Sequence, residues 1–280
     1  MNQIVVSAGS PAGITMTHLR AEAVLRKVLT AFERESIACV AVKGIVTAYE
    51  LYSQIGDRNI SDIDLRIASR DLDRVESIVQ AERWELRWRS RAYSNIVFRV
   101  DGMSVDVETM IGPPGLCAID VEAMIARSKW AESPGGCRRR QPEIHDHALL
   151  LCINIFKDKF TGAFAWSIED VERIAKRSEF DVERFIALTR EGRVEAIVWI
   201  VADWMATERG SVAWRAIRDR IGASPRPLYA WLLGRLRRDA NTSLAFRVLA
   251  RMASDSALAW PRALYGAAGW EIEARRRGAE

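Results

Sequence analysis

The sequence predicts an α+β domain, built as a mixed β-sheet with flanking helices, followed by an all-α helical domain. Apolar runs of strand length alternate with helical periodicity through about residue 110. The strand signal then disappears after Pro142, and helical periodicity recurs to the C-terminus. The stretch 133–142 is rich in Gly, Pro and Arg, which favours a linker. We therefore expect an N-terminal domain over residues 1–135 and a helical domain over residues 141–280.

The first half reads as helices alternating with strands. Residues 1–14 carry no periodic pattern, and we expect them to be loosely attached. Asp101-Gly102 is a strong signal for a two-residue hairpin between two strands. Helices are expected at 15–36, 44–54, 69–80 and 119–131, and strands at 37–42, 62–68, 84–89, 94–100 and 103–110.

The second half reads as helices only. Breakers such as Gly162, Gly192 and Gly210 separate several of the apolar-periodic segments. Helices are expected at about 144–160, 166–178, 181–190, 192–208, 211–221, 226–238, 243–254 and 257–276.

Composition sets broad limits on the class of protein. The 280 residues are 49% hydrophobic and 28% charged, as in an ordinary globular protein. No apolar run reaches the roughly 18–20 residues that span a bilayer, and the N-terminus lacks a signal-peptide pattern, so we expect a cytoplasmic protein with no membrane partner. The four cysteines are scattered without a C-x-x-C spacing, which favours reduced thiols over a zinc site.

The positive charge is uneven along the chain. The net charge is +4, yet from residue 209 onward there are 14 Arg and no Lys against 6 acidic residues. A basic C-terminal half suggests an anionic partner, and nucleic acid is one possibility. A solvated, Arg-rich helical surface would give the same composition.

The stretch "RNISDIDLRI", residues 58–67, places two aspartates in a run that otherwise reads as a strand. Alternate strand residues share one face, so Asp62 and Asp64 project together, roughly 6–7 Å apart at the backbone. Ile63 then faces the core. The later run "SVDVE" repeats this pattern with Asp106 and Glu108.

Asp62, Asp64 and Asp106 are therefore candidate metal ligands, with Glu108 in reserve. Three carboxylates from two strands offer the hard oxygen ligands that suit Mg²⁺ or Mn²⁺. Such a site would act on a phosphate. Exposed acidic side chains at strand ends are the alternative interpretation of the same pattern.

Four further residues are candidates for binding the phosphates of a nucleotide. Lys43 and Gly44 lie at an expected strand-to-helix turn, where glycine permits close approach and a helix N-terminus favours an anion. Arg58 and Ser61 precede the aspartate pair. Alternatively, Lys43 pairs with an acidic neighbour, and Arg58 forms a salt bridge with an aspartate.

The stretch "VKGIVTAYELYSQIGDRNISDIDLRI" resembles the nucleotidyltransferase superfamily of DNA polymerase β type, in particular a poorly characterised bacterial branch. The matching residues are Lys43, Gly44, Tyr49 or Tyr52, Arg58, and the run Asp62-Ile63-Asp64-Leu65. The resemblance implies that Asp62, Asp64 and Asp106 are the catalytic, metal-binding carboxylates.

The resemblance extends to "LCINIFKDKFTGAFAWSIEDVERIA" and so covers roughly residues 37–175. Trp166 and Asp170 match the family pattern, and Lys157 is kept, but Asn154 and Asp158 replace two histidines. The nearby His145-x-His147 pair invites a metal interpretation, yet its place at a helix start favours capping or a surface position.

The resemblance implies a Mg²⁺-dependent enzyme that transfers a nucleoside monophosphate from a nucleoside triphosphate, ATP among the candidates, to a hydroxyl or phosphate. Asp106 would also accept the proton of the acceptor. The acceptor stays open: a small molecule, a peptide or other natural product that is tailored in this way, a protein, or RNA. The alternative is a nucleotide- or nucleic-acid-binding module, or a component of toxin–antitoxin type, that uses the basic helical half without turnover.

Overall fold

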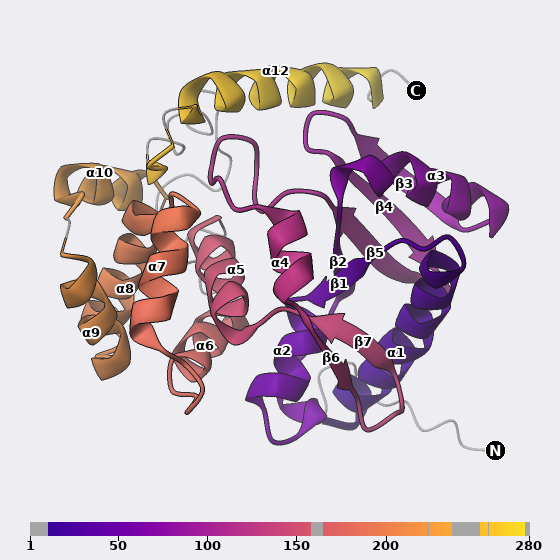
Figure 1. Ribbon diagram of the computed structural model, residues 1–280, viewed down its shortest axis with the longest axis horizontal. Helices are drawn as coiled ribbons and strands as arrows, with labels where there is room; N and C mark the ends of the chain where they lie inside the picture. Colours follow the sequence, from indigo (N-terminus) through magenta and orange to yellow (C-terminus); the bar gives the residue numbers. More distant parts are fainter. Residues whose placement is uncertain (1–10, 158–164, 223, 237–252, 257, 278–280) are drawn as a thin grey trace. The chain divides into compact units, whose positions relative to one another are not determined.

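The computed structural model describes residues 11–157, 165–222, 224–236, 253–256 and 258–277 of the chain. These residues form two compact units (Figure 1). The first contains the described residues up to Arg89 together with Ser94–Thr109 and Val121–Glu143. The second contains Ser90–Tyr93, Met110–Asp120 and the described residues from Ile144 onward. The predicted fold class, a mixed sheet with flanking helices followed by a helical half, is confirmed.

The first unit is built around a five-stranded sheet with strand order β1-β2-β5-β4-β3. The strands are β1 (Cys39–Val42), β2 (Asp62–Ile67), β3 (Glu85–Ser90), β4 (Asn95–Val100) and β5 (Met103–Glu108). The helices are α1 (Pro11–Arg34), α2 (Gly44–Leu51), α3 (Leu72–Ala81) and α4 (Val121–Arg127), with short 3₁₀ turns at Ile55–Asp57 and Ser69–Asp71.

The sheet is mixed because β2 and β5 run parallel while their outer neighbours run antiparallel to them. β2 pairs with β1 on one side and β5 pairs with β4 on the other. The β4–β5 turn is the two-residue hairpin expected at Asp101-Gly102, where both residues have positive φ, as in a type I′ turn.

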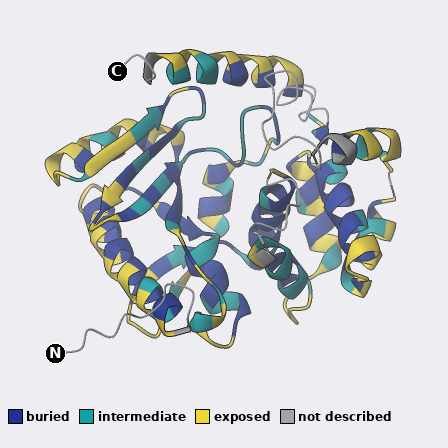
Figure 2. Ribbon diagram, turned by 180° about the vertical axis from the view of Figure 1, so that it is seen from behind, coloured by how far each residue is buried: buried dark blue, intermediate teal, exposed yellow. Residues whose placement is uncertain are grey.

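One face of the sheet is apolar and lies in the core of this unit. Alternate residues of β2 and β5, among them Ile63, Leu65, Val105 and Val107, are fully buried there. Figure 2 shows dark blue, buried segments along the strands of the sheet. Apolar side chains of α1 and α3 belong to the same core. Because strand side chains alternate, the polar residues between them are directed to the opposite face of the sheet.

The stretch 133–142 is part of a hairpin, where the sequence favoured a linker. β6 (Lys129–Glu132) pairs with β7 (Arg138–Gln141), and the expected helix over 119–131 is limited to α4. Arg139 faces inward, only 2% exposed, with its guanidinium 5.1 Å from the centre of the Tyr49 ring. An arginine can be buried when its guanidinium lies over an aromatic ring, so an arginine-rich stretch can form a packed strand. The charge of the stretch by itself does not indicate this.

Residues 11–14, expected to be loosely attached, form the first turn of α1. Buried Ile14 and His18 lie on this helix, so its first turns pack on the unit through their inward side. The expectation for residues 1–10 lies outside the described part of the chain.

The second unit is helical in the part of the chain that the structure describes. Its core includes Trp214, whose indole N–H donates to the carbonyl of Val171 at 2.9 Å. The helix expected over 243–254 falls mainly on residues outside the described ranges. The helices are α5 (Ile144–Lys157), α6 (Ala165–Ile174), α7 (Val182–Glu191), α8 (Glu195–Glu208), α9 (Val212–Ile221), α10 (Arg226–Leu236) and α12 (Ala259–Arg277).

The last helix, α12, packs on loops that come from earlier in the sequence. The backbone N–H groups of Arg91 and Ala92 donate to Oε1 of Glu273 at 2.9 and 3.1 Å. Tyr93 contacts Trp270 edge to face. These contacts explain why the short segment Ser90–Tyr93 belongs to the second unit.

Within the described ranges, every helix is either too short or too polar to cross a membrane.

We expect Ile63→Ala to lower the free energy of unfolding of the first unit by about 2–5 kcal/mol, because it leaves a cavity under the sheet. Leu86→Ala is the matched control, since Leu86 is 41% exposed on the edge strand β3, and its effect should stay below about 1 kcal/mol. Urea unfolding followed by circular dichroism measures both. Equal losses in the two variants would contradict this account of the core.

Candidate functional site

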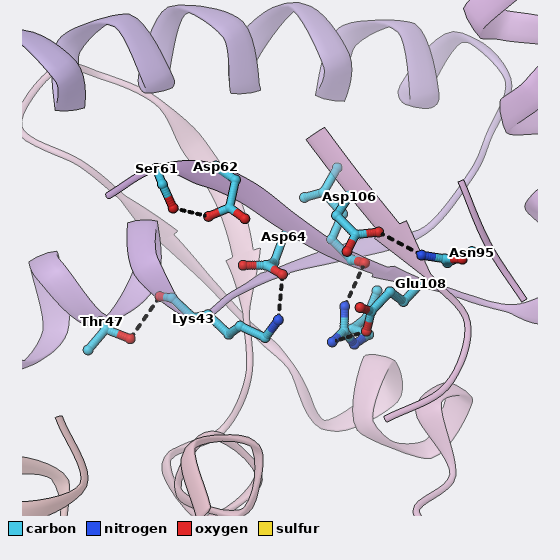
Figure 3. A network of polar contacts seen from close by, with 10 residues as sticks. Lys43, Thr47, Ser61, Asp62, Asp64, Asn95, Asp106 and Glu108 are labelled. Atoms are coloured by element: carbon cyan, nitrogen blue, oxygen red, sulfur yellow. Dashed lines mark hydrogen bonds and ion pairs between the residues drawn. The ribbon is translucent and has the colours of Figure 1, made fainter. Parts of the chain in front are cut away.

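The candidate site lies on the polar face of the sheet, where β2 and β5 run side by side. Asp64 pairs in register with Asp106, and Arg66 with Glu108, so charged side chains of two neighbouring parallel strands meet. Figure 3 shows the carboxylates of Asp62, Asp64 and Asp106 facing one region of the sheet surface. This is the arrangement that the alternation in the two sequence stretches predicts.

Three carboxylates come together closely. One oxygen each of Asp64, Asp106 and Glu108 lie within 4.8 Å of one another. Asp62 lies two residues before Asp64 on β2. Its carboxylate accepts a hydrogen bond from the Ser61 hydroxyl at 2.9 Å. The structure therefore gathers two of the three expected ligands together with Glu108, which the sequence offered only in reserve.

Lys43 supplies a positive charge to this group. Its ammonium donates to Oδ1 of Asp64 at 2.6 Å, and both side chains are largely buried. Burial by itself would lower the pKa of Lys43, but the charges of Asp64 and Glu108 outweigh it and raise the pKa overall. The lysine therefore stays protonated, and its ion pair with Asp64 is the pairing with an acidic neighbour that the sequence offered as the alternative to a nucleotide contact.

The backbone of Lys43 is strained. β1 ends at Val42 and α2 begins at Gly44, so Lys43 makes the whole strand-to-helix turn, with φ 53° and ψ −132°. Residues with a Cβ rarely adopt this conformation. The turn is held by the carbonyl of Lys43, which accepts from the Thr47 hydroxyl at 2.8 Å and from the Val46 N–H at 2.9 Å. Lys43 directly follows Val42, the register partner of Asp64, and its ammonium lies beside that carboxylate.

Arg66 is a site residue that the sequence reasoning missed. It is 2% exposed and forms an ion pair with Glu108, and its Nε has no hydrogen-bond partner. Arg66 shares the face of Asp62 and Asp64 because it follows them at the same two-residue spacing. The sequence signal that could have identified Arg66 is its basic side chain on the polar side of the predicted strand.

Asn95 of β4 is a second residue that was missed. Its amide donates to Oδ1 of Asp106 at 3.3 Å (Figure 3). Asn95 lies opposite Glu108 in the antiparallel β4–β5 pair, so it belongs to the same polar face. No local sequence signal identifies it, because its role depends on the pairing of β4 with β5.

The electrostatic effects on Asp62 and Asp106 have a common origin. Burial, then the charge of Glu108, then that of Asp64 raise the pKa of Asp106 to about 7. Burial, followed by the charge of Asp64, raises the pKa of Asp62, while the Ser61 hydrogen bond and the charges of Lys43 and Arg58 oppose that rise. Both carboxylates are therefore harder to ionise than an isolated aspartate.

The charges of the site do not balance. Four carboxylates (Asp62, Asp64, Asp106 and Glu108) face three cationic groups (Lys43, Arg66 and Arg58), which leaves one negative charge when every carboxylate is ionised. Three converging carboxylate oxygens are the ligand type that Mg²⁺ and Mn²⁺ prefer. The donor set and the excess negative charge both fit a divalent cation.

Gly44 allows the loop before β2 to approach the start of α2. A Cβ at Gly44 would lie 3.1 Å from Nη1 of Arg58 and 3.1 Å from Cγ2 of Ile60. The space that the missing Cβ of Gly44 leaves is therefore filled by the side chains of Arg58 and Ile60. This packing holds the guanidinium of Arg58 near the strand-to-helix turn, where its charge also acts on Asp62.

His18 of α1 supports the same loop. It is fully buried, and its Nε2–H donates to the carbonyl of Arg58 at 2.7 Å. Burial lowers the pKa of His18, which favours the neutral ring. The ring also contacts Tyr49 of α2 edge to face, and the Tyr49 hydroxyl donates to Glu22 of α1. These contacts join α1, α2 and the Arg58 loop behind the site.

The histidine pair has a structural position. His145 is buried in α5, and its Nε2 accepts from the N–H of Asp181, the N-cap residue of α7. His147 is fully buried as well, so the expected surface position was wrong. Asp158, one of the two histidine replacements, lies outside the described residues.

The sequence matches the family described as "Uncharacterised nucleotidyltransferase" over residues 10–207, well over half of the chain. The chain belongs to this nucleotidyltransferase family. The match includes the whole five-stranded sheet with its carboxylates and continues through most of α8. No curated protein sequence matches this nucleotidyltransferase.

Two solved structures resemble this family member at low identity. One is an antigenic nucleotidyltransferase-like protein from Paracoccidioides brasiliensis, with TM-score 0.42 and 11% identity over 70% of this chain and 92% of that one. The other is the antibiotic-resistance factor ANT(2'')-Ia, with TM-score 0.36 and 14% identity over 78% of this chain and 97% of that one. Both similarities are too distant to indicate a substrate.

We expect Lys43→Gly to unfold with a free energy about 1–2 kcal/mol higher than Lys43→Ala. Both variants lose the ion pair with Asp64, but only glycine adopts φ 53° and ψ −132° without strain. Urea unfolding measures the difference. The same two substitutions at Lys129, in the strand β6, are the control, and there the glycine variant should be the less stable one. Equal stability of the two Lys43 variants would contradict a strained turn.

We expect Asp106→Asn to stabilise the protein at pH 8 and to lose this advantage by pH 5. A carboxyl whose folded-state pKa is raised to about 7 makes the folded protein less stable as the pH rises from about 4 through 7. Asparagine removes that ionisation. Melting temperatures in EDTA at each pH test this, with a gain of a few degrees expected at pH 8. A pH-independent difference would contradict the raised pKa.

Proposed function

We propose that this protein transfers a nucleoside monophosphate from a nucleoside triphosphate to a hydroxyl or phosphate of an acceptor, with Mg²⁺ or Mn²⁺ as cofactor. One observation carries the proposal: Asp64, Asp106 and Glu108 converge on two adjacent parallel strands in a chain of the nucleotidyltransferase family. In this reaction the acceptor oxygen attacks the α-phosphorus. The bond from that phosphorus to the bridging oxygen breaks, and pyrophosphate leaves.

Asp64, Asp106 and Glu108 would hold the cation, with Asp62 at the edge of the group. When bound, a divalent cation would neutralise phosphate charge and favour the ionised acceptor oxygen. Arg66, which pairs with Glu108, would position that carboxylate for the cation. Asn95 does the same for Asp106 through its amide.

Lys43, Gly44, Arg58 and Ser61 are the proposed nucleotide-contacting residues. Lys43 places a protonated amine at the start of α2, where a helix N-terminus also favours an anion. Arg58 brings a second cation to this turn, over Gly44. Two cations beside the carboxylates suit a triphosphate, which carries several negative charges and needs partners besides the metal.

The acceptor is proposed by class only: a small molecule, a tailored peptide or other natural product, a protein, or RNA. None of the four cysteines forms a disulfide. Free thiols are usual in reducing compartments, and we propose that the enzyme works in the cytoplasm.

The test is a thermal-shift titration with ATP, GTP, CTP and UTP, each with Mg²⁺ or with EDTA. A nucleotide at 100 times its Kd should add about 2.7 kcal/mol of stability, which is several degrees in Tm. We expect a Mg²⁺-dependent shift in the wild type that is absent in the Asp64→Asn/Asp106→Asn variant. Asp101→Asn, in the exposed β4–β5 turn, is the matched control and should behave as the wild type.

The nucleotide that gives the shift is then supplied with a label on its α-phosphate, together with candidate acceptors. Transfer of the label with release of pyrophosphate would support the proposal. Metal-dependent binding that never leads to transfer would favour a nucleotide-binding module. The absence of any shift, or an equal shift in the double variant, would contradict the proposed site.

A further inference from the structure

A second pocket opens in the first unit, beside the start of β1. It has a volume of about 290 Å³ and lies between the end of α1, the start of β1 and the β6–β7 hairpin. Cys39, at its base, pairs with Ile67, whereas Val42 at the other end of β1 pairs with Asp64. The pocket is thus about 10 Å along the strand from the carboxylate cluster. The proposed nucleotide site does not use it.

The floor of the pocket is apolar. It is formed by Leu29 of α1 and by Ile37, Ala38 and Cys39 at the entry to β1. Burial raises the pKa of the Cys39 thiol to about 12, so this side chain stays neutral at physiological pH. An apolar floor favours a ligand with an apolar body.

The wall contributed by the hairpin is aromatic and basic. Trp130 is 50% exposed, although tryptophan is usually well buried. The guanidinium groups of Arg138 and Arg140 lie 4.5 and 5.5 Å from the centre of its ring. Trp130 and Arg140 are register partners in the antiparallel hairpin, so both side chains are on the same face. That face is opposite to the one on which Arg139 is buried.

Arg140 has unused hydrogen-bonding capacity. Its Nε is buried and has no hydrogen-bond partner. A buried donor without a partner destabilises a fold by about 1–3 kcal/mol, so such groups usually have a partner in the functional state. The pocket is lined by one cationic side chain, Arg140, and by one carboxylate, Glu33, on an exposed position of α1.

We propose that this pocket is a second small-molecule site, which takes a planar aromatic ligand with one anionic group, such as an aromatic carboxylate. The ring system would lie on the apolar floor against Trp130, and Arg140 would bind the anion. The volume is just below the usual range for small-molecule sites, which suits a ligand of one or two fused rings. The site is independent of nucleotide transfer.

The test uses two probes of nearly equal shape, naphthalene-1-carboxylate and the neutral naphthalene-1-methanol. Each is titrated against the whole protein by isothermal calorimetry in EDTA and without nucleotide. We expect the carboxylate to bind at least tenfold more tightly than the alcohol. Arg140→Leu should remove this preference and leave weak binding of both probes. Ala38→Trp, at an exposed position of the apolar lining, should block both.

Two controls separate this site from the carboxylate cluster and from charge in general. Asp64→Asn should bind naphthalene-1-carboxylate as the wild type does, because the two sites are apart. Arg215→Leu removes an exposed arginine of α9 and should also leave binding unchanged. Equal affinities for the two probes in the wild type, or saturable binding that survives both Arg140→Leu and Ala38→Trp, would overturn the proposal. So would the absence of saturable binding of the carboxylate.

Discussion

The packing of the apolar side of the sheet holds the carboxylates of the other side together. Ile63, Leu65, Val105 and Val107 are fully buried, and each such side chain contributes about 1.5–3 kcal/mol. An uncompensated buried charge costs about 3–5 kcal/mol, so a few core residues offset the repulsion on the polar face. Because side chains alternate along a strand, burying these apolar residues places Asp64 and Asp106 on the opposite face of the sheet, and the register of β2 with β5 then sets the two aspartates side by side.

The cationic side chains of the site compensate the repulsion between its carboxylates only in part. Lys43 neutralises Asp64 and Arg66 neutralises Glu108. Asp106 accepts a hydrogen bond from the amide of Asn95, and burial, Glu108 and Asp64 raise its pKa by more than the charges of Arg66 and Lys43 lower it. The raised pKa of Asp106, about 7, reflects this incomplete compensation. A site that keeps an excess of negative charge is less stable by itself but binds a cation more strongly. The strained backbone of Lys43 fits this pattern, since strain is tolerated where it positions a functional group.

The support behind the site comes from helices distant in sequence. His18 of α1 holds the carbonyl of Arg58, and Glu22 of the same helix accepts from Tyr49 of α2. Arg139 of the β6–β7 hairpin covers the ring of Tyr49. The hairpin therefore has two sides with different roles: its inner side completes the support of α2, and its outer side carries Trp130 and Arg140 at the second pocket.

The sequence by itself determined the alternation of helices and strands, the Asp101-Gly102 hairpin, and the polar face that carries Asp62, Asp64 and Asp106, because period and turn chemistry are local properties. The tertiary structure alone decided which charges meet. The parallel register of β2 and β5 joined Glu108 to the group, and the pairing of β4 brought Asn95. The contact of Arg139 on β7 with the Tyr49 ring and the contact of His18 with Arg58 also join segments that are distant in the sequence. Such contacts depend on the pairing of distant segments, which no short stretch of sequence encodes.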